Sequence, residues 1–348
     1  MRFLKTQSRK GDTIVGLDLG SQQWKGVLIR RNAERLQLCE YVVTPCPAAP
    51  GKPESQAAAA DTVQAMLSQL KTSMRSVVVA ISSPSAWVAE IEIPRTPPEE
   101  LRAVISLNST RYLRRDLVGY YFEAAELAES GPNGKARRGA TMRVLVAAAL
   151  REEVLWYRNA LSEAKVRAET IELSALTMIN ALQRTHAEVC EQNIVLLLDI
   201  GHQFTRLSFL SHGQPLLTRM MPYGGAQITE QVAATLGLQP AAAEQHKRAM
   251  TTQVMDAVRQ SLQTLVREVR SSIDFVERQY DCALRYAFAG GGTACNRAIL
   301  DMLGQDLGIS VQQWNPVEGY DTKGLDPAEL AGVAPCLGPA VGVAVAKL

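Results

Sequence analysis

Two short segments of this chain repeat one pattern, and this internal repeat constrains the fold more than any other feature. Each segment is an apolar run that ends in Asp-x-Gly, followed by a polar turn and a second apolar run. The first copy spans residues 14–29 and the second spans residues 195–210. Two apolar runs joined by such a turn predict a β-hairpin, so the chain builds this hairpin twice.

The residues at the two turns suit phosphate and metal binding. A glycine lets backbone N–H groups point at an anion. The aspartates, Asp18 and Asp199, are placed to hold a metal ion through water. One Asp-x-Gly turn alone would be ordinary hairpin chemistry, but two copies that face each other would clamp a polyphosphate from both sides.

Composition limits the classes of protein that remain. With 348 residues and 47% hydrophobic residues, the chain is long enough for two domains or one large duplicated domain. A net charge of +2 and 5% aromatic residues argue against nucleic-acid binding. The six cysteines are scattered without a CxxC pair, which favours reduced thiols in a cytosolic protein.

Three further segments shape the expected organisation. Residues 1–12 form a basic tail, either solvated or weakly drawn to an anionic membrane surface. Residues 252–280 carry one continuous apolar stripe at helical spacing, which predicts a long core helix. The uncharged run 330–346 is interrupted by glycines and prolines, so we expect a buried segment rather than a membrane helix.

A third motif follows the second hairpin. Residues 289–293, Ala-Gly-Gly-Gly-Thr, lie between a predicted strand and a predicted helix, where glycines allow close backbone approach to a ligand. The order of hairpin, hairpin and glycine loop resembles the actin-like ATPase superfamily. Residues 222–230 and 243–247 resemble the "GG…T…A-E-x-x-K" segment of FtsA, DnaK-type chaperones and PilM. Length, the segment 77–127 and an end at Leu348 without an amphipathic helix make the chain most similar to the PilM family.

This resemblance implies an α/β actin-like ATPase fold in which two duplicated domains surround a nucleotide cleft. The first domain would span residues 13–189, with an FtsA-type side subdomain inserted at about 78–165. The second domain would span residues 190–330 and carry the adenosine loop. Residues 331–348 would pack back on the first domain.

The resemblance also implies roles for individual residues with ATP and Mg²⁺ as cofactors. Asp18 and Asp199 would face the metal, Glu244 and Lys247 would contact ribose and adenine, and Glu172 would orient the attacking water unless it only caps a helix. The implied nucleotide ligands are Asp18, Gly20, Ser21, Lys25, Asp199, Gly201, Thr205, Gly224, Gly225, Glu244, Lys247, Gly290, Gly291 and Gly292.

Both predicted phosphate turns depart from the superfamily pattern. Related second turns are rich in Ser and Thr, whereas residues 202–205 read His-Gln-Phe-Thr. The first turn, residues 21–24, ends in the bulky Trp24. Two interpretations stay open: weak ATP binding with at most slow hydrolysis, or a scaffold whose pocket has degenerated. His202 is either a pH-sensitive phosphate ligand or an ordinary turn residue.

PilM-type proteins act through partners, so the resemblance implies an ATP-binding cytoplasmic platform held at the inner membrane by those partners. The main partner would be the N-terminal segment of a PilN-like single-pass membrane protein, bound in a groove lined by residues 78–127. Arg111, Arg114 and Arg115 would either meet an acidic partner or form a solvated helix face. Contacts with pilus motor ATPases and self-association are further expectations. The alternatives are a small-molecule kinase and an FtsA-like filament-forming division protein.

Overall fold

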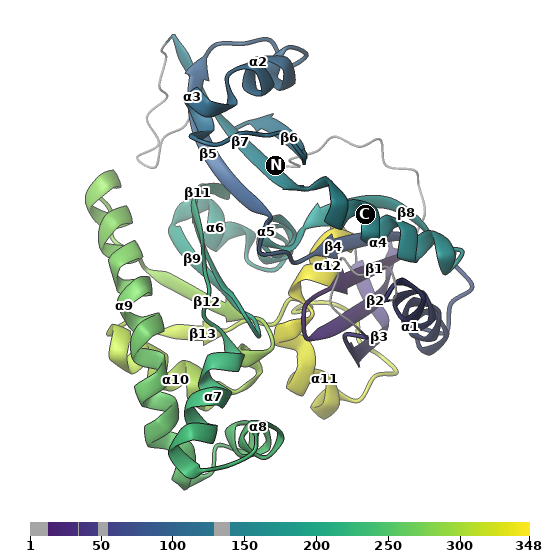
Figure 1. The fold of residues 1–348 in the computed structure, drawn as a ribbon, viewed down its shortest axis with the longest axis vertical. Coiled ribbons are helices and arrows are strands. Elements are labelled where there is room, and N and C mark those ends of the chain that lie inside the picture. Colours follow the sequence, from purple (N-terminus) through teal and green to yellow (C-terminus); the bar gives the residue numbers. More distant parts are fainter. Residues whose placement is uncertain (1–12, 34, 48–54, 129–139) are drawn as a thin grey trace.

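The computed structural model describes residues 13–33, 35–47, 55–128 and 140–348. The expected basic tail at residues 1–12 lies outside the described residues. The architecture consists of two five-stranded sheets and one three-stranded sheet, surrounded by helices (Figure 1).

The two large sheets share one topology. Each has three antiparallel strands followed by two parallel strands, in the orders β3-β2-β1-β4-β8 and β11-β10-β9-β12-β13. The first sheet contains β1 (Thr13–Leu19), β2 (Gln23–Asn32), β3 (Arg35–Pro45), β4 (Ser76–Ile81) and β8 (Arg167–Leu173). The second contains β9 (Ile194–Ile200), β10 (Thr205–Ser211), β11 (Gln214–Met221), β12 (Tyr286–Gly290) and β13 (Val311–Gln313). The predicted duplicated α/β fold is therefore present.

Helices cover both sheets. Those of the first half are α1 (Ser55–Gln69), α4 (Arg151–Glu163), α5 (Ser174–Thr185) and α6 (Ala187–Gln192). Those of the second half are α7 (Gly225–Leu236), α8 (Pro240–Ala249), η1 (Thr252–Val254), α9 (Met255–Tyr280), η2 (Thr293–Cys295) and α10 (Arg297–Leu307). The predicted apolar stripe lies on α9, where Val258, Leu262 and Leu265 are fully buried against the second sheet.

The chain ends in α11 (Pro327–Val333), η3 (Ala334–Cys336) and α12 (Gly338–Val345). Helix α12 is buried along its length and packs on α5 and β1, in a core that also includes side chains of the second sheet. A shared apolar core therefore joins the two halves. Among the described residues, no single helix is long and apolar enough to cross a membrane, although 327–336 and 338–345, bent by 82°, reach that length together.

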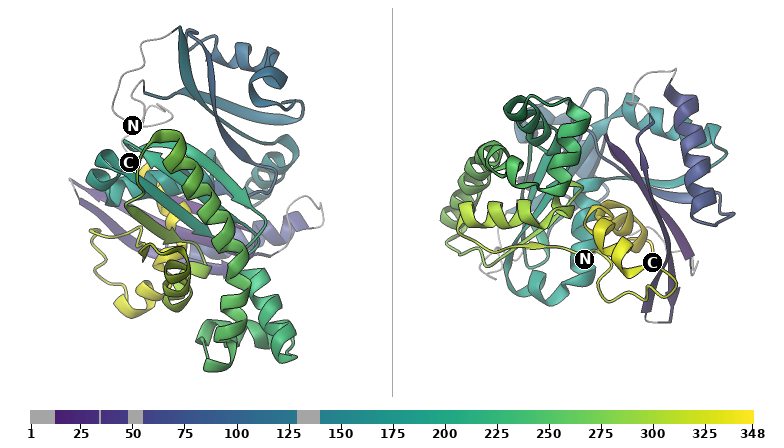
Figure 2. Two further views of the ribbon diagram at one scale, coloured as in Figure 1. Left: turned by 90° about the vertical axis from the view of Figure 1, so that its left-hand side faces the viewer. Right: turned by 90° about the horizontal axis from the view of Figure 1, so that it is seen from below.

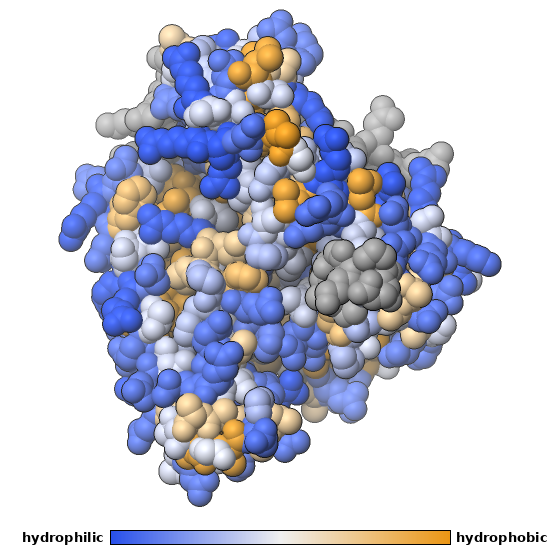
Figure 3. Space-filling model, viewed as in Figure 1, coloured by the Kyte–Doolittle hydropathy of each residue, from blue (hydrophilic) through white to orange (hydrophobic). Residues whose placement is uncertain are grey.

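A small α/β unit projects from one end of the molecule (Figures 1 and 2). Its sheet has the order β5-β7-β6, formed by β5 (Trp87–Pro94), β6 (Tyr120–Glu126) and β7 (Thr141–Leu150). Helices α2 (Leu101–Leu107) and α3 (Ser109–Leu113) pack on one face of this sheet. The view in Figure 3 shows a mainly hydrophilic surface with hydrophobic residues in small separate patches.

Candidate functional site

The first predicted hairpin is formed by β1 and β2, and it brings a carboxylate and an ammonium together. Asp18 lies opposite Lys25 in the antiparallel register, so both side chains leave the same face of the sheet. Lys25 Nζ lies 3.0 Å from Asp18 Oδ2, and Asp18 is 2% exposed. Burial raises the pKa of the Asp18 carboxyl. Burial acts to lower the pKa of Lys25, but the Asp18 charge outweighs it and raises that pKa.

The second hairpin, formed by β9 and β10, repeats this arrangement with another cation. Asp199 lies opposite Arg206, again seven positions further along the chain. Arg206 Nη1 lies 3.5 Å from Asp199 Oδ2 and also 3.5 Å from Oγ of Ser82, which follows β4 in the first half. The sequence analysis missed Arg206, although its offset from Asp199 equals that of Lys25 from Asp18.

A cavity of about 600 Å³ lies between the two hairpins. It is large enough for a nucleotide-sized ligand. Most of the predicted nucleotide ligands line it: Asp18, Gly20, Ser21, Lys25, Asp199, Gly201, Gly225, Glu244, Lys247, Gly291 and Gly292. The cavity is thus lined by both Asp-x-Gly turns, the glycine loop after β12 and helix α8.

Three of the expected ligands do not line this cavity and have structural positions instead. Thr205 is buried at the start of β10, where its hydroxyl donates to the carbonyl of Tyr223 at 2.7 Å. Gly224 packs its Cα against the carbonyls of Gly201 and His202, which fixes the start of α7. Gly290 is enclosed by Met178, Pro335 and Trp314. Contact of these three residues with a nucleotide stays a prediction.

The bulky residue expected in the first turn does not occupy it. Trp24 belongs to β2 rather than to the first turn, and its side chain is buried in the core of the first half. The second turn is closed by a hydrogen bond from the Gly201 N–H to the Phe204 carbonyl, 3.0 Å long. His202 lines the cavity, and burial together with the nearby Lys247 charge lowers its pKa.

Lys247 and Glu244 form a closed polar network on α8. The Lys247 ammonium donates to the Gly225 carbonyl at 3.0 Å, to Thr229 Oγ1 at 2.8 Å and to Glu244 Oε2 at 2.6 Å. These contacts use all three of its N–H donors. Burial lowers the pKa of Lys247, and Glu244 offsets this only in part. Burial acts to raise the pKa of Glu244, but hydrogen bonds from Lys247 and Thr229 lower it overall.

The glycine loop approaches the second hairpin very closely. Gly291 has a φ of +94°, and a Cβ at this position would lie 2.6 Å from the Ile200 carbonyl oxygen and 2.7 Å from Asp199 Oδ1. Both the backbone conformation and the space require glycine here. Gly292, by contrast, has nothing within 4 Å of the corresponding position. Gly291 therefore sets the distance between the loop and the carboxylate.

The donor set of the cavity fits a nucleotide with Mg²⁺. Oδ1 of Asp18 is buried and has no hydrogen-bond partner among the described residues, so it is free to accept from metal-bound water. The described chain offers no group of three or more metal-ligating side chains. Mg²⁺ is usually held by one or two carboxylates together with water and substrate phosphates. Asp18 and Asp199 would supply the carboxylates.

Two of the scattered cysteines meet at this cavity. Cys295 of η2 and Cys336 of η3 both line it. A hydrogen bond between the two thiols lowers the pKa of Cys295, while the same bond together with burial raises the pKa of Cys336. Sequence spacing gave no sign of this pairing because the two residues lie on separate turns far apart in the chain.

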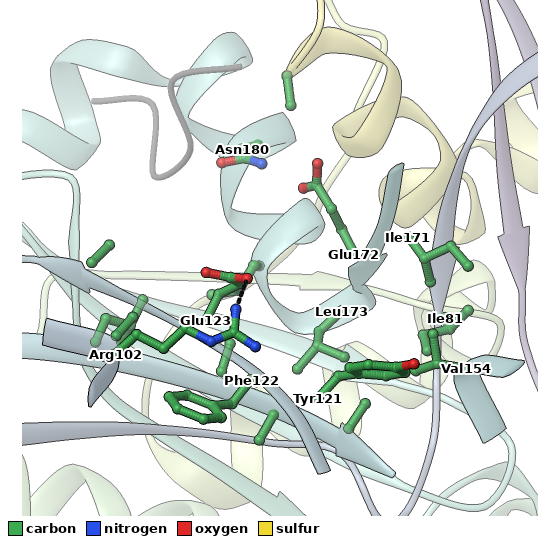
Figure 4. Close-up of a pocket in the computed structure, with 18 of the residues that line it drawn as sticks. Ile81, Arg102, Tyr121, Phe122, Glu123, Val154, Ile171, Glu172, Leu173 and Asn180 are labelled. Carbon is green, nitrogen blue, oxygen red and sulfur yellow. Dashed lines mark hydrogen bonds and ion pairs between the residues drawn. The ribbon is translucent and has the colours of Figure 1, made fainter. Parts of the chain in front are cut away.

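Glu172, the expected catalytic residue, lies elsewhere. It belongs to the end of strand β8 rather than to a helix start, and it lines a second cavity of about 760 Å³. Burial raises its pKa, and Lys347 offsets this in part. Figure 4 shows Glu172 extending from β8 beside Asn180 of α5. It is therefore not brought to the cleft that contains the two aspartates.

This second cavity is a groove between the three-stranded sheet on one side and α4, β8 and α5 on the other. Five consecutive residues of β6, 121–125, line it. Side chains alternate between faces along a strand, so a run of consecutive lining residues means that the groove follows the strand's edge. Among the strands that the structure describes, β6 pairs with β7 alone, which leaves that edge open.

The groove differs in part from the expected partner surface of residues 78–127. Only Ile81, Arg102 and the β6 residues come from that range, and the rest of the lining comes from β7, α4, β8, α5 and the end of α12. Arg111, Arg114 and Arg115 do not line it. Arg115 instead stacks over Trp87, with its guanidinium carbon 4.7 Å from the ring centroid.

Comparisons with known proteins agree with this architecture. The family model described as "Type IV pilus assembly protein PilM" matches residues 16–348. A solved structure entitled "PilM-PilN type IV pilus biogenesis complex" is 25% identical, with a TM-score of 0.85 and coverage of 97% of this chain and 99% of that one.

More distant solved structures share the fold alone. The ethanolamine utilization protein EutJ from Carboxydothermus hydrogenoformans is 14% identical, with a TM-score of 0.56 and coverage of 97% of this chain and 90% of that one. MreB5 of Spiroplasma citri bound to ADP is 11% identical, with a TM-score of 0.50 and coverage of 88% and 93%. The resemblance found in the sequence is confirmed, and the chain belongs to the PilM family of type IV pilus assembly proteins, with an actin-like ATPase fold.

Proposed function

We propose that this protein is a cytoplasmic scaffold of type IV pilus assembly that binds ATP in its central cleft and the N-terminal cytoplasmic segment of a PilN-type membrane protein in its side groove. The observation that carries the proposal is the similarity, over nearly the whole of both chains, to a structure solved as a PilM–PilN complex. Such a scaffold would sit at the inner membrane through this partner and connect it to the pilus motor ATPases.

The side groove has the properties that an extended peptide needs. The open edge of β6 presents backbone N–H and C=O groups, to which a peptide adds as a further strand. The small side chains of Ala147 and Ala149 on β7 leave room for the peptide's own side chains. At the rim, Arg102 Nη1 forms an ion pair with Glu123 at 2.8 Å, and both side chains are exposed. This pair is available to exchange with charged groups of a partner.

The central cleft supports nucleotide binding more than it supports hydrolysis. Asp18 and Asp199 line it from opposite hairpins beside the glycine loop, which supports binding of a triphosphate with Mg²⁺. The carboxylate expected to orient water, Glu172, lines the other cavity. We therefore assign ATP a role in setting the conformation of the scaffold, and we assign no hydrolytic residue.

Peptide binding tests the proposal directly. A fluorescently labelled peptide, corresponding to the cytoplasmic N-terminus of the PilN-type protein from the same organism, is titrated with the full chain. Ala147→Trp fills the groove and should weaken binding at least tenfold. Ala234→Trp adds the same side chain at an exposed position on α7 and should leave binding unchanged. Absence of wild-type binding, or equal binding by Ala147→Trp, would overturn the assignment of the groove.

A further inference from the structure

Arg206 lines the central cavity but does not belong to the expected set of nucleotide ligands. It is a buried arginine, 9% exposed, that extends from β10 beside Asp199 and lines the central cavity. A buried guanidinium is costly unless charged or polar partners satisfy it. The hydrogen bonds that Arg206 makes therefore indicate which kind of ligand it is suited to bind.

Those contacts leave most of its donors unused. A guanidinium carries five N–H donors. Both hydrogen bonds of Arg206, to Asp199 Oδ2 and to Ser82 Oγ, use Nη1, and both are 3.5 Å long. This length is at the outer limit for a hydrogen bond, whereas ordinary N–H···O bonds are close to 2.9 Å. Nε and Nη2 have no hydrogen-bond partner among the described residues, so Arg206 is loosely held and still able to donate.

The other cations around the cavity are less suited to receive a new anion. Lys247 has all its donors engaged by neutral and acidic groups. Lys25 uses one of its three donors on Asp18, but this ion pair is short at 3.0 Å. Arg248 is largely exposed and bonds Glu244, 2.9 Å away, and Arg297 is also exposed. Arg206 thus combines burial and spare donors with the longest of the ion pairs around the described part of the cleft.

The charges in the cleft also favour phosphate binding by Arg206. The two cleft aspartates are each matched by one cation, so these two ion pairs together carry no net charge. A polyphosphate brings several negative charges to this buried position, and a planar guanidinium binds phosphate oxygens in two-pronged fashion. If Arg206 turns from Asp199 to the phosphates, the Asp199 carboxylate becomes free to face Mg²⁺ and its water.

We propose that Arg206 is a phosphate-binding residue of the second hairpin, which exchanges its pairing with Asp199 for the polyphosphate of a nucleoside triphosphate. The proposal rests on the nucleotide part of the proposed function and adds a residue to it. It assigns Asp199 and Arg206 as an ion pair before a nucleotide binds and as separate ligands, one for metal-bound water and one for phosphate, once it has bound.

The test is displacement of a fluorescent ATP analogue from the full chain by two competitors, inorganic tripolyphosphate and adenosine, in the presence of Mg²⁺. Arg206→Gln should weaken competition by tripolyphosphate at least tenfold, which is the size expected for loss of one charge-assisted contact. Competition by adenosine should stay within about twofold of the wild-type value. Arg206→Lys, which keeps the charge, should give an intermediate loss and serves if the Gln variant does not fold.

Two control variants separate phosphate contact from structural support. Arg219→Gln removes an arginine from the adjacent strand β11, where it bonds Ser272 away from the cleft, and should change neither competitor. Ser82→Ala removes the other partner of Arg206 and should not reproduce the loss.

An equal loss for both competitors in Arg206→Gln, or no loss for tripolyphosphate, would overturn the Arg206 assignment alone. Failure of the wild-type chain to bind the analogue, or of tripolyphosphate to compete, would remove the nucleotide function as well.

Discussion

The two Asp-x-Gly hairpins are identical in register and different in chemistry. In both, the aspartate faces a cation seven residues later on the neighbouring strand. The first pair, Lys25 with Asp18, is short at 3.0 Å and almost completely buried. The second pair, Arg206 with Asp199, is 3.5 Å apart and shares its guanidinium with Ser82 of the other half.

This difference shows what duplication preserves. The backbone geometry of the hairpin, fixed by the turn glycine and the strand register, is the same in both halves. The cation that pairs with the carboxylate differs between the halves. A lysine gives a compact point charge, whereas an arginine gives a planar fork with more donors. We interpret the first hairpin as a closed, stabilising ion pair and the second as a pair that opens for a ligand.

The largest expected effect separates the two pairs by their contribution to stability. Lys25→Met leaves the Asp18 carboxylate buried without a cation and should lower the free energy of unfolding by about 3–5 kcal/mol. Arg206→Met should cost less, about 1–2 kcal/mol, because its pair is longer and Asp199 is 9% exposed. Denaturant unfolding of both variants near neutral pH measures the difference.

The double variant Asp18→Asn/Lys25→Met is the control for this prediction. It removes both charges, so it should recover much of the stability that Lys25→Met loses. If Arg206→Met proves as destabilising as Lys25→Met, the second hairpin is as closed as the first and the contrast between them fails.

A smaller effect on stability concerns Gly291, which packs closely against Asp199 of the second hairpin. Gly291→Ala places a Cβ against the Ile200 carbonyl and Asp199 at a positive φ, and should destabilise the protein by about 2–3 kcal/mol. It should also weaken binding of an ATP analogue, because the loop is pushed from Asp199. Gly292→Ala, one residue along with open space around it, is the matched control and should change stability by less than about 1 kcal/mol. Thermal unfolding and analogue titration of both variants measure these effects.

The sequence predicted the parts of the fold that repeat or follow a regular period. The two hairpins were visible as apolar runs with Asp-x-Gly ends, and the stripe of α9 was visible as helical spacing. These features depend on local patterning, which a single sequence records. The glycine loop was also found, because a strand followed by consecutive glycines and a helix is a local signal.

The features that the sequence analysis missed are long-range or depend on strand boundaries. Glu172 was placed at a helix start, but β8 continues to Leu173, so its side chain faces the groove. The sequence pattern predicts that Thr205 ends the second turn, but β10 begins there and buries its hydroxyl. Arg206 was overlooked because an arginine in an apolar strand carries no motif, and only the register opposite Asp199 reveals its place.

The smallest expected effect concerns the residue after each turn glycine, Ser21 in the first hairpin and His202 in the second. Burial and Lys247 lower the pKa of His202 below 6.5 in the folded protein. The unfolded chain therefore binds this proton at a higher pH than the folded chain does, so His202 contributes a loss of stability as the pH falls below about 6.5. His202→Ser, which makes the second turn like the first, should reduce that loss.

Unfolding free energies measured by denaturant titration between pH 7.5 and pH 5 (roughly the range that spans histidine titration) test this effect. The change in slope should stay well under the ~1.4 kcal/mol per pH unit of one full proton, because His202 is only partly buried. Equal slopes for the variant and the wild-type chain would mean that His202 titrates alike in both states. The two turns would then differ in sequence without differing in electrostatics, and the asymmetry between the hairpins would be confined to Lys25 and Arg206.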